Sequence, residues 1–227
     1  MRPNRGEAHG GGELSEPRTP LYRNPFVIAF LAGIVTLTLI RPLLRREPEP
    51  PPVLSQLPAF SLTDQEGRAY GSAELTGQVY IASFFFSRCP SICPALMHNV
   101  LKLQEGFSAR GIEGVRLVSI TVDPENDTPP VLQEYGRLLK ADPARWTFLT
   151  GPRDTVEALV VSGFKTPMDR EETPPGSAME IAHTGKVVLV DGAGRIRGYY
   201  STDEMGLDEV FNRAQHVLKQ QREQARG

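Results

Sequence analysis

Hydrophobic and polar positions divide the chain into an irregular front part and a regular body that begins near Leu57. In the body, short apolar runs, typical of strands buried on both faces, alternate with stretches whose apolar residues recur at helical spacing. The expected strands are 79–86, 115–122, 146–149, 186–190 and 195–200. The expected helices are 94–108, 128–140, 154–163 and 207–220. This alternation predicts an α/β fold.

Two turn signals complete the body. Phe60–Thr63 alternates in polarity and is followed by turn residues at 64–67, so we expect a short hairpin near the start. The residues Asp-Gly-Ala-Gly at 191–194 separate two expected strands and predict a second hairpin, which the last helix follows. Strands and helices that alternate and then close with a hairpin and a helix predict a thioredoxin-like sandwich with a central mixed sheet over residues 57–220.

The front part contains one long apolar segment. Residues 1–24 are rich in Gly, Pro and Arg without an apolar period, and are expected to form a disordered tail. Residues 25–44 are predicted to form a transmembrane anchor, because a span of about 20 mostly apolar residues crosses a bilayer. A cleaved signal peptide is the alternative, but no Ala-x-Ala-like site follows, so we expect the anchor to be retained.

The residues after this segment carry both prolines and positive charge. Residues 45–56 are Pro-rich and predict a stiff polyproline stalk, whose dozen residues at about 3.1 Å each would hold the body roughly 35–40 Å from the membrane. Arg41, Arg45 and Arg46 follow the apolar segment, and a positive-inside count therefore places the body in the cytoplasm. The net charge of −2, without a basic cluster in the body, gives no indication of a nucleic-acid partner.

The candidate chemistry centres on the only two cysteines, Cys89 and Cys93, which lie between the first central strand and its helix. A helix N-terminus favours a thiolate, the form that attacks disulfides and binds soft metals. Three intervening residues, rather than the two of thioredoxin-type enzymes, suit thiolates that flank an ion and still permit a disulfide. Two inert buried cysteines are a weaker explanation, because proline-flanked turns are poor places to bury a small side chain. The pair predicts a redox couple, a soft-metal site, or both.

A third ligand has few candidates among the four histidines. Two are expected to be solvated, in the tail and on the last helix: His9 and His216. His98 is five positions after Cys93 and therefore not on the same helical face. His183 lies between the Pro- and acid-rich segment 165–180 and the strand 186–190, where it is either a ligand or an ordinary residue at a strand start.

The motif Cys-Pro-Ser-Ile-Cys-Pro at 89–94 resembles the Cys-Pro-x-x-Cys-Pro motif of the Sco/SenC family, copper-handling proteins for cytochrome c oxidase. The segments 119–129, 183–191 and 194–199 also match, in the family's order and spacing. One departure is Ser91, where the family often has Asp between the cysteines. Asp123 and Asp127, within the second segment, are expected in caps and turns, with a supporting role beside the site as a weaker alternative.

The resemblance implies a copper site formed by Cys89, Cys93 and His183. Cu(I) prefers thiolates and accepts low coordination numbers, whereas zinc normally takes a fourth ligand. The implied function is that of a membrane-anchored copper chaperone that helps to assemble the copper centre of cytochrome c oxidase, with the copper-binding oxidase subunit as partner. It also implies a single-pass inner-membrane protein with its domain on the periplasmic side, against the charge count.

An alternative function uses the same two thiols. A thiol–disulfide oxidoreductase would keep target cysteines reduced through a redox-active disulfide between Cys89 and Cys93. Copper-site cysteines on a target must be reduced before they bind metal, so the two activities can coexist. The sequence leaves open which of them dominates, and with it whether the protein is an enzyme in addition to a metallochaperone.

Overall fold

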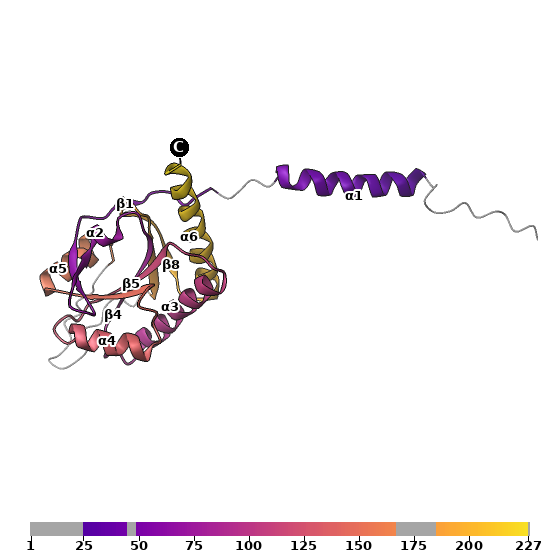
Figure 1. Ribbon diagram of the computed structural model, residues 1–227. Coiled ribbons are helices and arrows are strands. Elements are labelled where there is room, and N and C mark those ends of the chain that lie inside the picture. The colour runs from indigo at the N-terminus through magenta and orange to yellow at the C-terminus, as the bar shows by residue number, and fades with distance from the viewer. Residues whose placement is uncertain (1–24, 45–48, 167–184, 227) are drawn as a thin grey trace, which may run out of the picture. The chain divides into compact units, whose positions relative to one another are not determined.

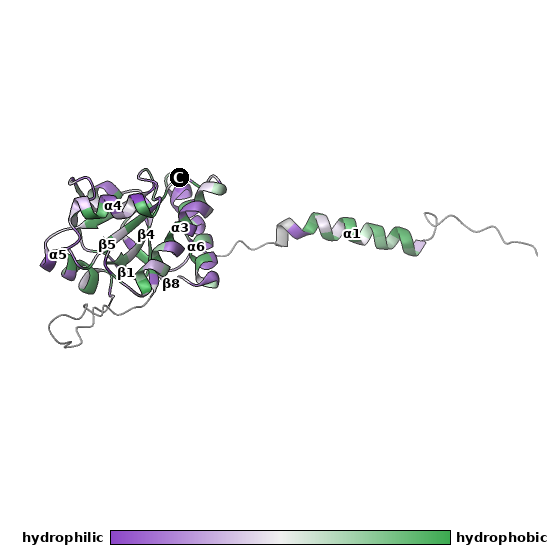
Figure 2. Cartoon of the chain, turned by 90° about the horizontal axis from the view of Figure 1, so that it is seen from below, coloured by the Kyte–Doolittle hydropathy of each residue, from purple (hydrophilic) through white to green (hydrophobic). Residues whose placement is uncertain are grey.

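The computed structural model describes residues 25–44, 49–166 and 185–226 (Figure 1). The chain divides into two compact units, residues 1–48 and 49–227. The described part of the first unit is the helix α1 (Pro25–Leu44), which is apolar along most of its length (Figure 2). Its bounds are those of the predicted anchor. Within the described ranges, however, no helix is long and apolar enough to cross a membrane, so the transmembrane prediction is not confirmed. The predicted tail at 1–24 lies outside the described residues.

The second unit is built on one mixed sheet with the strand order β1-β8-β7-β4-β5-β6-β2-β3. Its strands are β1 (Ser55–Gln56), β2 (Ser61–Asp64), β3 (Ala69–Gly71), β4 (Val79–Phe85), β5 (Val115–Thr121), β6 (Trp146–Thr150), β7 (Lys186–Val190) and β8 (Arg195–Ser201). The strands β4, β5 and β6 are parallel, while β7 and β8 form an antiparallel hairpin beside β4. Both predicted hairpins and the central mixed sheet are therefore confirmed.

Helices flank this sheet on both sides. They are α2 (Ser72–Leu75), α3 (Ile92–Ala109), α4 (Pro129–Leu138), α5 (Arg153–Glu157), the π-helix η2 (Ala158–Gly163) and α6 (Glu204–Gln224). Figures 1 and 2 show α3 and α6 together on one side of the sheet and α5 on the other. The rings of Phe107 on α3 and Phe211 on α6 stack with centroids 4.7 Å apart. This contact joins the helix that follows the first cysteine to the last helix of the chain.

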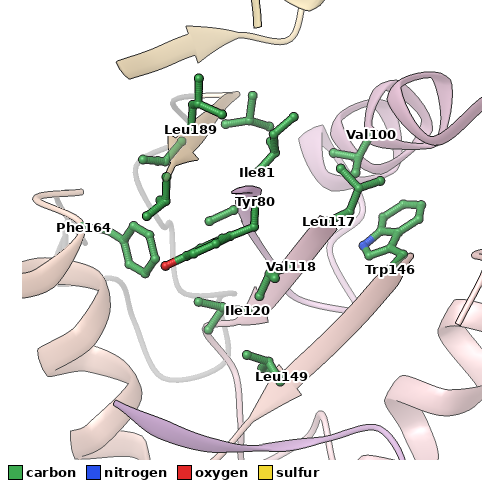
Figure 3. Packing of buried hydrophobic residues seen from close by; sticks show 14 of the residues in the cluster. Tyr80, Ile81, Val100, Leu117, Val118, Ile120, Trp146, Leu149, Phe164 and Leu189 are labelled. Atoms are coloured by element: carbon green, nitrogen blue, oxygen red, sulfur yellow. The ribbon is translucent and has the colours of Figure 1, made fainter. Parts of the chain in front are cut away.

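The central strands carry the hydrophobic core (Figure 3). Side chains of β4, β5 and β6 are buried at nearly every position, as expected for parallel strands covered on both faces. Trp146, the only tryptophan, is fully buried and donates its indole N–H to Ser119 Oγ at 2.8 Å. Ser119 Oγ in turn lies 2.7 Å from Ser83 Oγ on β4. Hydrogen bonding offsets the cost of placing these polar atoms in the core.

Three helix boundaries differ from the prediction. The helix α3 begins at Ile92, two residues early, which places Cys93 in its first turn. The helix α6 begins at Glu204, because Asp203 caps it by accepting a hydrogen bond from the Gly206 N–H at 2.8 Å. The predicted helix 154–163 is divided into α5 and η2, since the apolar spacing of a single turn does not distinguish α from π geometry.

The described part of the predicted stalk packs on the globular unit. The guanidinium of Arg197, only 5% exposed, donates from Nε to the carbonyl of Pro51 at 2.8 Å and from Nη1 to Asp191 Oδ2 at 2.9 Å. Further along, β1 pairs with β8. A polyproline segment makes no internal hydrogen bonds, so its carbonyl is available to this buried cation. The described part of the predicted stalk is therefore bound to the globular unit at Pro51 and at β1. Residues 45–48 lie outside the described ranges.

The Arg197 contacts predict a large loss of stability on substitution. Arg197→Met should lower the free energy of unfolding by about 3–5 kcal/mol, because it removes the buried cation that pairs with the buried Asp191 carboxylate and leaves the Pro51 carbonyl without its donor. Arg195 pairs with the same carboxylate but is 37% exposed, so Arg195→Met should cost less than about 1 kcal/mol. Urea denaturation followed by the fluorescence of Trp146 measures both. Equal losses in the two variants would contradict this assignment.

Candidate metal and redox site

The two cysteines lie where the central strand ends. After Phe85, the last residue of β4, the chain passes through a turn in which the Cys89 N–H donates to the Phe86 carbonyl at 3.2 Å. Cys93 lies one residue into α3. This is the carboxyl end of a parallel strand, the edge at which α/β sheets generally bind their ligands. The location of the pair, at the strand end and the helix start, is as predicted.

Both cysteine side chains are buried, which differs from the expectation for a proline-flanked turn. Cys89 is 6% exposed and Cys93 is 5% exposed, and both belong to the core cluster. The turn residues Pro90 and Ser91 are exposed instead. The turn therefore presents its own backbone to solvent and directs the two flanking thiols inward. Both thiols are free.

The two thiols influence one another's ionisation and differ in acidity. Burial acts to raise the pKa of Cys89, but hydrogen bonds from the backbone N–H groups of Cys93 and Ser91 outweigh it, so the pKa lies below its ordinary value. Burial, the largest cause, raises the pKa of Cys93 to about 12, and the Cys89 thiol and the Asp127 carboxylate contribute to the rise. Cys89 is therefore the more nucleophilic sulfur of the metal-free pair.

Asp127 has the supporting role beside the cysteine turn that the sequence offered as the weaker alternative to a cap or turn. Its carboxylate is fully buried and accepts hydrogen bonds from the Ser87 N–H at 3.0 Å, from the Ser87 hydroxyl, and from the Thr121 hydroxyl at 2.5 Å. Ser87 is two residues before Cys89, and Thr121 ends β5. The carboxylate therefore holds the cysteine turn against the end of the neighbouring strand. Asp123, in contrast, forms a partly exposed ion pair with Arg88 at 3.1 Å.

Tyr135 on α4 is a site residue that sequence reasoning missed. Its ring stacks on Phe85 with centroids 5.1 Å apart. Its pKa is raised, chiefly by burial and further by the nearby charges of Cys93 and Asp127. The ring therefore packs against the end of β4, from which the cysteine turn begins. Its place on an amphipathic helix gave no signal of this, because only the tertiary fold brings α4 to the end of β4.

The structure can be compared with the predictions for two of the four histidines, His98 and His216. His98 is exposed on α3, whereas His216, which was expected to be solvated, is only partly exposed and its Nδ1 is buried without a hydrogen-bond partner. His9 and His183 lie outside the described residues. Among the residues that are described, no three His, Cys, Asp or Glu side chains form a group that could hold a metal ion. The structure therefore provides two thiols and leaves the predicted third ligand as a prediction.

Gly185 is the first described residue after His183, and it lies beside the cysteine helix. A Cβ added to Gly185 would lie 3.6 Å from Cδ1 of Ile92, the residue next to Cys93. The Gly185 carbonyl accepts hydrogen bonds from the Thr202 N–H at 3.0 Å and from the Thr202 hydroxyl at 2.8 Å. Its φ of 51° falls in the left-handed region that glycine adopts without strain. The start of β7 is therefore held against the first turn of α3.

Comparison with known proteins agrees with the motif. The family model described as SCO1/SenC matches residues 51–219, which is most of the chain. The chain belongs to the SCO1/SenC family. The match includes both cysteines, His183 and all eight strands of the sheet.

Relatives of this Sco chain include bacterial and mitochondrial proteins. The SCO1 protein homolog of Bacillus subtilis is 27% identical over 163 residues, covering 71% of this chain and 82% of the relative. The structure of BsSco, described as a member of the Sco family of cytochrome c oxidase assembly proteins with a disulfide switch, is 26% identical with a TM-score of 0.65, covering 75% of this chain and 98% of BsSco. Yeast Sco1 with copper bound is 26% identical with a TM-score of 0.58, covering 69% and 87% of the two chains. These structures confirm the predicted thioredoxin-like fold.

The acidity difference predicts the order in which the thiols react. In the reduced, metal-free Sco chain, alkylation of Cys89 should accelerate with a midpoint below the ordinary pKa of 9.0, because its thiolate forms first as the pH rises. Alkylation of Cys93 should remain slow until the pH approaches about 12. Iodoacetamide labelling over a pH series, with peptide mass spectrometry, measures both rates. Cys93→Ala is the control, since loss of its hydrogen bond should raise the Cys89 midpoint. Labelling of Cys93 before Cys89 would contradict the assignment.

Proposed function

We propose that this Sco chain binds one copper ion through the thiolates of Cys89 and Cys93 and the imidazole of His183, and delivers it during assembly of the copper centre of cytochrome c oxidase. The observation that carries the proposal is the pair of free, buried thiols in the turn and first residues of α3, at the end of the central strand β4. Membership of the SCO1/SenC family, the copper-bound yeast relative and the oxidase-assembly role given for BsSco support it.

The donor set suits Cu(I) as a cargo. Two thiolates form a soft site, and a site of low coordination number leaves room for an incoming ligand of the recipient protein. Copper must displace the Cys93 proton, because that thiol keeps its proton at neutral pH in the metal-free protein. The positive ion then offsets the repulsion between the Cys93 thiolate and the nearby Asp127 carboxylate. The family resemblance, rather than the donor set, supports the copper-binding subunit of cytochrome c oxidase as the recipient.

The contacts of Gly185 support His183 as the third ligand. Two residues reach at most about 7 Å, and a Cβ on Gly185 would lie 3.6 Å from Cδ1 of Ile92, the neighbour of Cys93. An imidazole two residues before Gly185 is therefore within reach of a metal held by the cysteines. Imidazole nitrogen matters more to Cu(II) than to Cu(I), so the histidine should contribute most to the oxidised site.

Thiol–disulfide exchange is a second candidate function, favoured by the unequal acidity of the two thiols. Cys89 has the character of an attacking thiolate, and Cys93 can resolve a mixed disulfide once it loses its proton. The disulfide switch described for BsSco agrees with this chemistry. Such a reductase would need both cysteines but no imidazole, and this difference separates the two functions.

We further propose that α1 attaches the chain to the inner membrane, with the globular unit on the periplasmic side. The support is the apolar surface of the helix, on which Phe26 is 83% exposed and Leu37 is 70% exposed. Apolar side chains gathered on an exposed helix are typical of contact with a membrane or another protein. The extracytoplasmic side is proposed on the family resemblance alone. The arginines after the helix favour the opposite placement, in the cytoplasm.

Copper titration of the reduced full chain in detergent tests the ligand set. One copper ion should bind per chain, and Cys89→Ser or Cys93→Ser should abolish tight binding. His183→Ala should weaken Cu(II) binding by more than about tenfold, or about 1.4 kcal/mol, and Cu(I) binding by less. Equilibrium competition with a chelator of known affinity measures these values.

The matched control is His98→Ala, which removes an exposed imidazole from α3 and should change neither affinity. If His183→Ala binds copper like the wild type, the imidazole is not a ligand. If the chain reduces a peptide disulfide without binding copper, the reductase function replaces the chaperone function.

Membrane attachment predicts that the full chain remains in the membrane fraction after alkaline carbonate washing, whereas a variant that begins at Glu49 is released. A reporter that is active only outside the cytoplasm, fused after Gly227, should be active. A full chain that is washed off, or a reporter that is active only in its cytoplasmic form, would contradict the attachment or the orientation respectively.

A further inference from the structure

The hydrogen-bonded ladder between β4 and β5 continues past its end through a side chain. The Val122 N–H donates to the carbonyl of Phe85, the last residue of β4, at 2.9 Å. Two residues later, the Ser87 N–H donates to Asp127 Oδ2 at 3.0 Å, in place of a backbone carbonyl. The Thr121 hydroxyl, at the end of β5, donates to the same oxygen at 2.5 Å. The carboxylate therefore joins the first residues after β4 to the end of β5.

The loop that carries this carboxylate holds it in place. The Asp127 N–H donates to the Asp123 carbonyl at 2.9 Å, and the Asn126 side chain donates to the two Asp123 carboxylate oxygens at 2.9 and 3.0 Å. The Asp123 N–H donates to Thr121 Oγ1 at 3.1 Å, so the loop folds back on the end of β5. Asp127 is fully buried, and its hydrogen bonds are shielded from water. Ser87 is therefore bound to an acceptor that has little freedom to move.

The turn that the carboxylate holds reaches both sulfurs. Ser87 is two residues before Cys89, and the Cys89 N–H closes the turn on the Phe86 carbonyl at 3.2 Å. Burial raises the pKa of Cys93, and a hydrogen bond from the Phe86 backbone acts against that rise. Cys93 is fixed in the first turn of α3. The placement of the turn therefore decides how the Cys89 sulfur meets the Cys93 sulfur.

We infer that Asp127 is a positioning residue for the thiol pair: by holding the cysteine turn to the end of β5, its carboxylate raises the effective concentration of one sulfur toward the other. The inference rests on the proposed function, since copper binding and disulfide formation both bridge these two sulfurs. Groups that are held in place before they are bridged lose less conformational entropy on bridging. Loss of the carboxylate should therefore weaken both the copper complex and the disulfide.

Equilibration of the metal-free full chain in detergent with glutathione and glutathione disulfide measures this effective concentration. The two protein thiols lose two protons and two electrons as the S–S bond forms, and one glutathione disulfide becomes two glutathione molecules. Asp127→Ala should lower the equilibrium constant for disulfide formation about tenfold, which raises the reduction potential by about 30 mV. Thr121→Val keeps the side-chain shape but removes one donor, and should lower the constant about threefold to fivefold. Cu(I) affinity, from chelator competition, should fall in the same order.

A conservative variant and a matched control accompany these substitutions. In Asp127→Asn, the amide oxygen can accept from the Ser87 N–H and the Thr121 hydroxyl, and the amide N–H can donate to the Ser87 hydroxyl. Its equilibrium constant should therefore stay within about twofold of the wild type. Ser83→Ala is the control, because Ser83 Oγ is also buried on β4 and lies 2.7 Å from Ser119 Oγ on β5. It should lower the thermal stability and leave the equilibrium constant unchanged.

Several outcomes separate position from charge and from stability. A loss in Asp127→Asn as large as that in Asp127→Ala would assign the effect to the charge and overturn the inference. Equal equilibrium constants in Thr121→Val and Ser83→Ala would also overturn it, and these two variants decide the matter if Asp127→Ala does not fold. A wild-type chain that forms the disulfide but binds no copper would overturn the copper function alone, because the glutathione equilibrium still measures the positioning. A chain that does neither would overturn both.

Discussion

Burial of β4 between β5 and β7 is the constraint on which the rest of the structure depends. The strand is apolar and almost fully buried, so it can occupy only the middle of a sheet that is covered on both faces. Its direction then fixes where the chain leaves the core, and the cysteine turn follows at that point. The thiols are inside the protein because the turn is short and its outer surface is taken by Pro90 and Ser91.

A buried thiol pair at the end of a rigid strand has chemical consequences. The helix start supplies N–H groups to one sulfur, while the apolar core surrounds the other. The same turn therefore lowers the pKa of Cys89 and raises the pKa of Cys93. The Asp127 carboxylate maintains this arrangement by holding Ser87 and Thr121 together, so the turn cannot move away from β5 without leaving buried polar groups unpaired.

Much of the fold could be predicted from the sequence, because apolar runs of strand length and helical spacing follow directly from burial. The position of Cys89 and Cys93 could be predicted for the same reason. A motif that follows an apolar strand and precedes a helix must lie at the carboxyl end of that strand. The burial of both thiols could not, because it depends on the direction of side chains within one turn. The supporting role of Asp127 could be stated only as the weaker of two alternatives. The packing of Tyr135 on Phe85 and that of Pro51 on Arg197 could not be predicted, since these are tertiary contacts between segments far apart in sequence.

The contact of Arg197 with Pro51 fixes the place where the leading segment joins the sheet. Arg197 lies near Val190, which pairs with Tyr80 at the beginning of β4, whereas the cysteines follow the end of that strand. Seven residues of strand, about 20 Å, therefore stand between the point where the leading segment joins the globular unit and the thiols. The leading segment therefore joins the globular unit at the opposite end of β4 from the thiols, so a change made there acts on the sheet far from the cysteine turn.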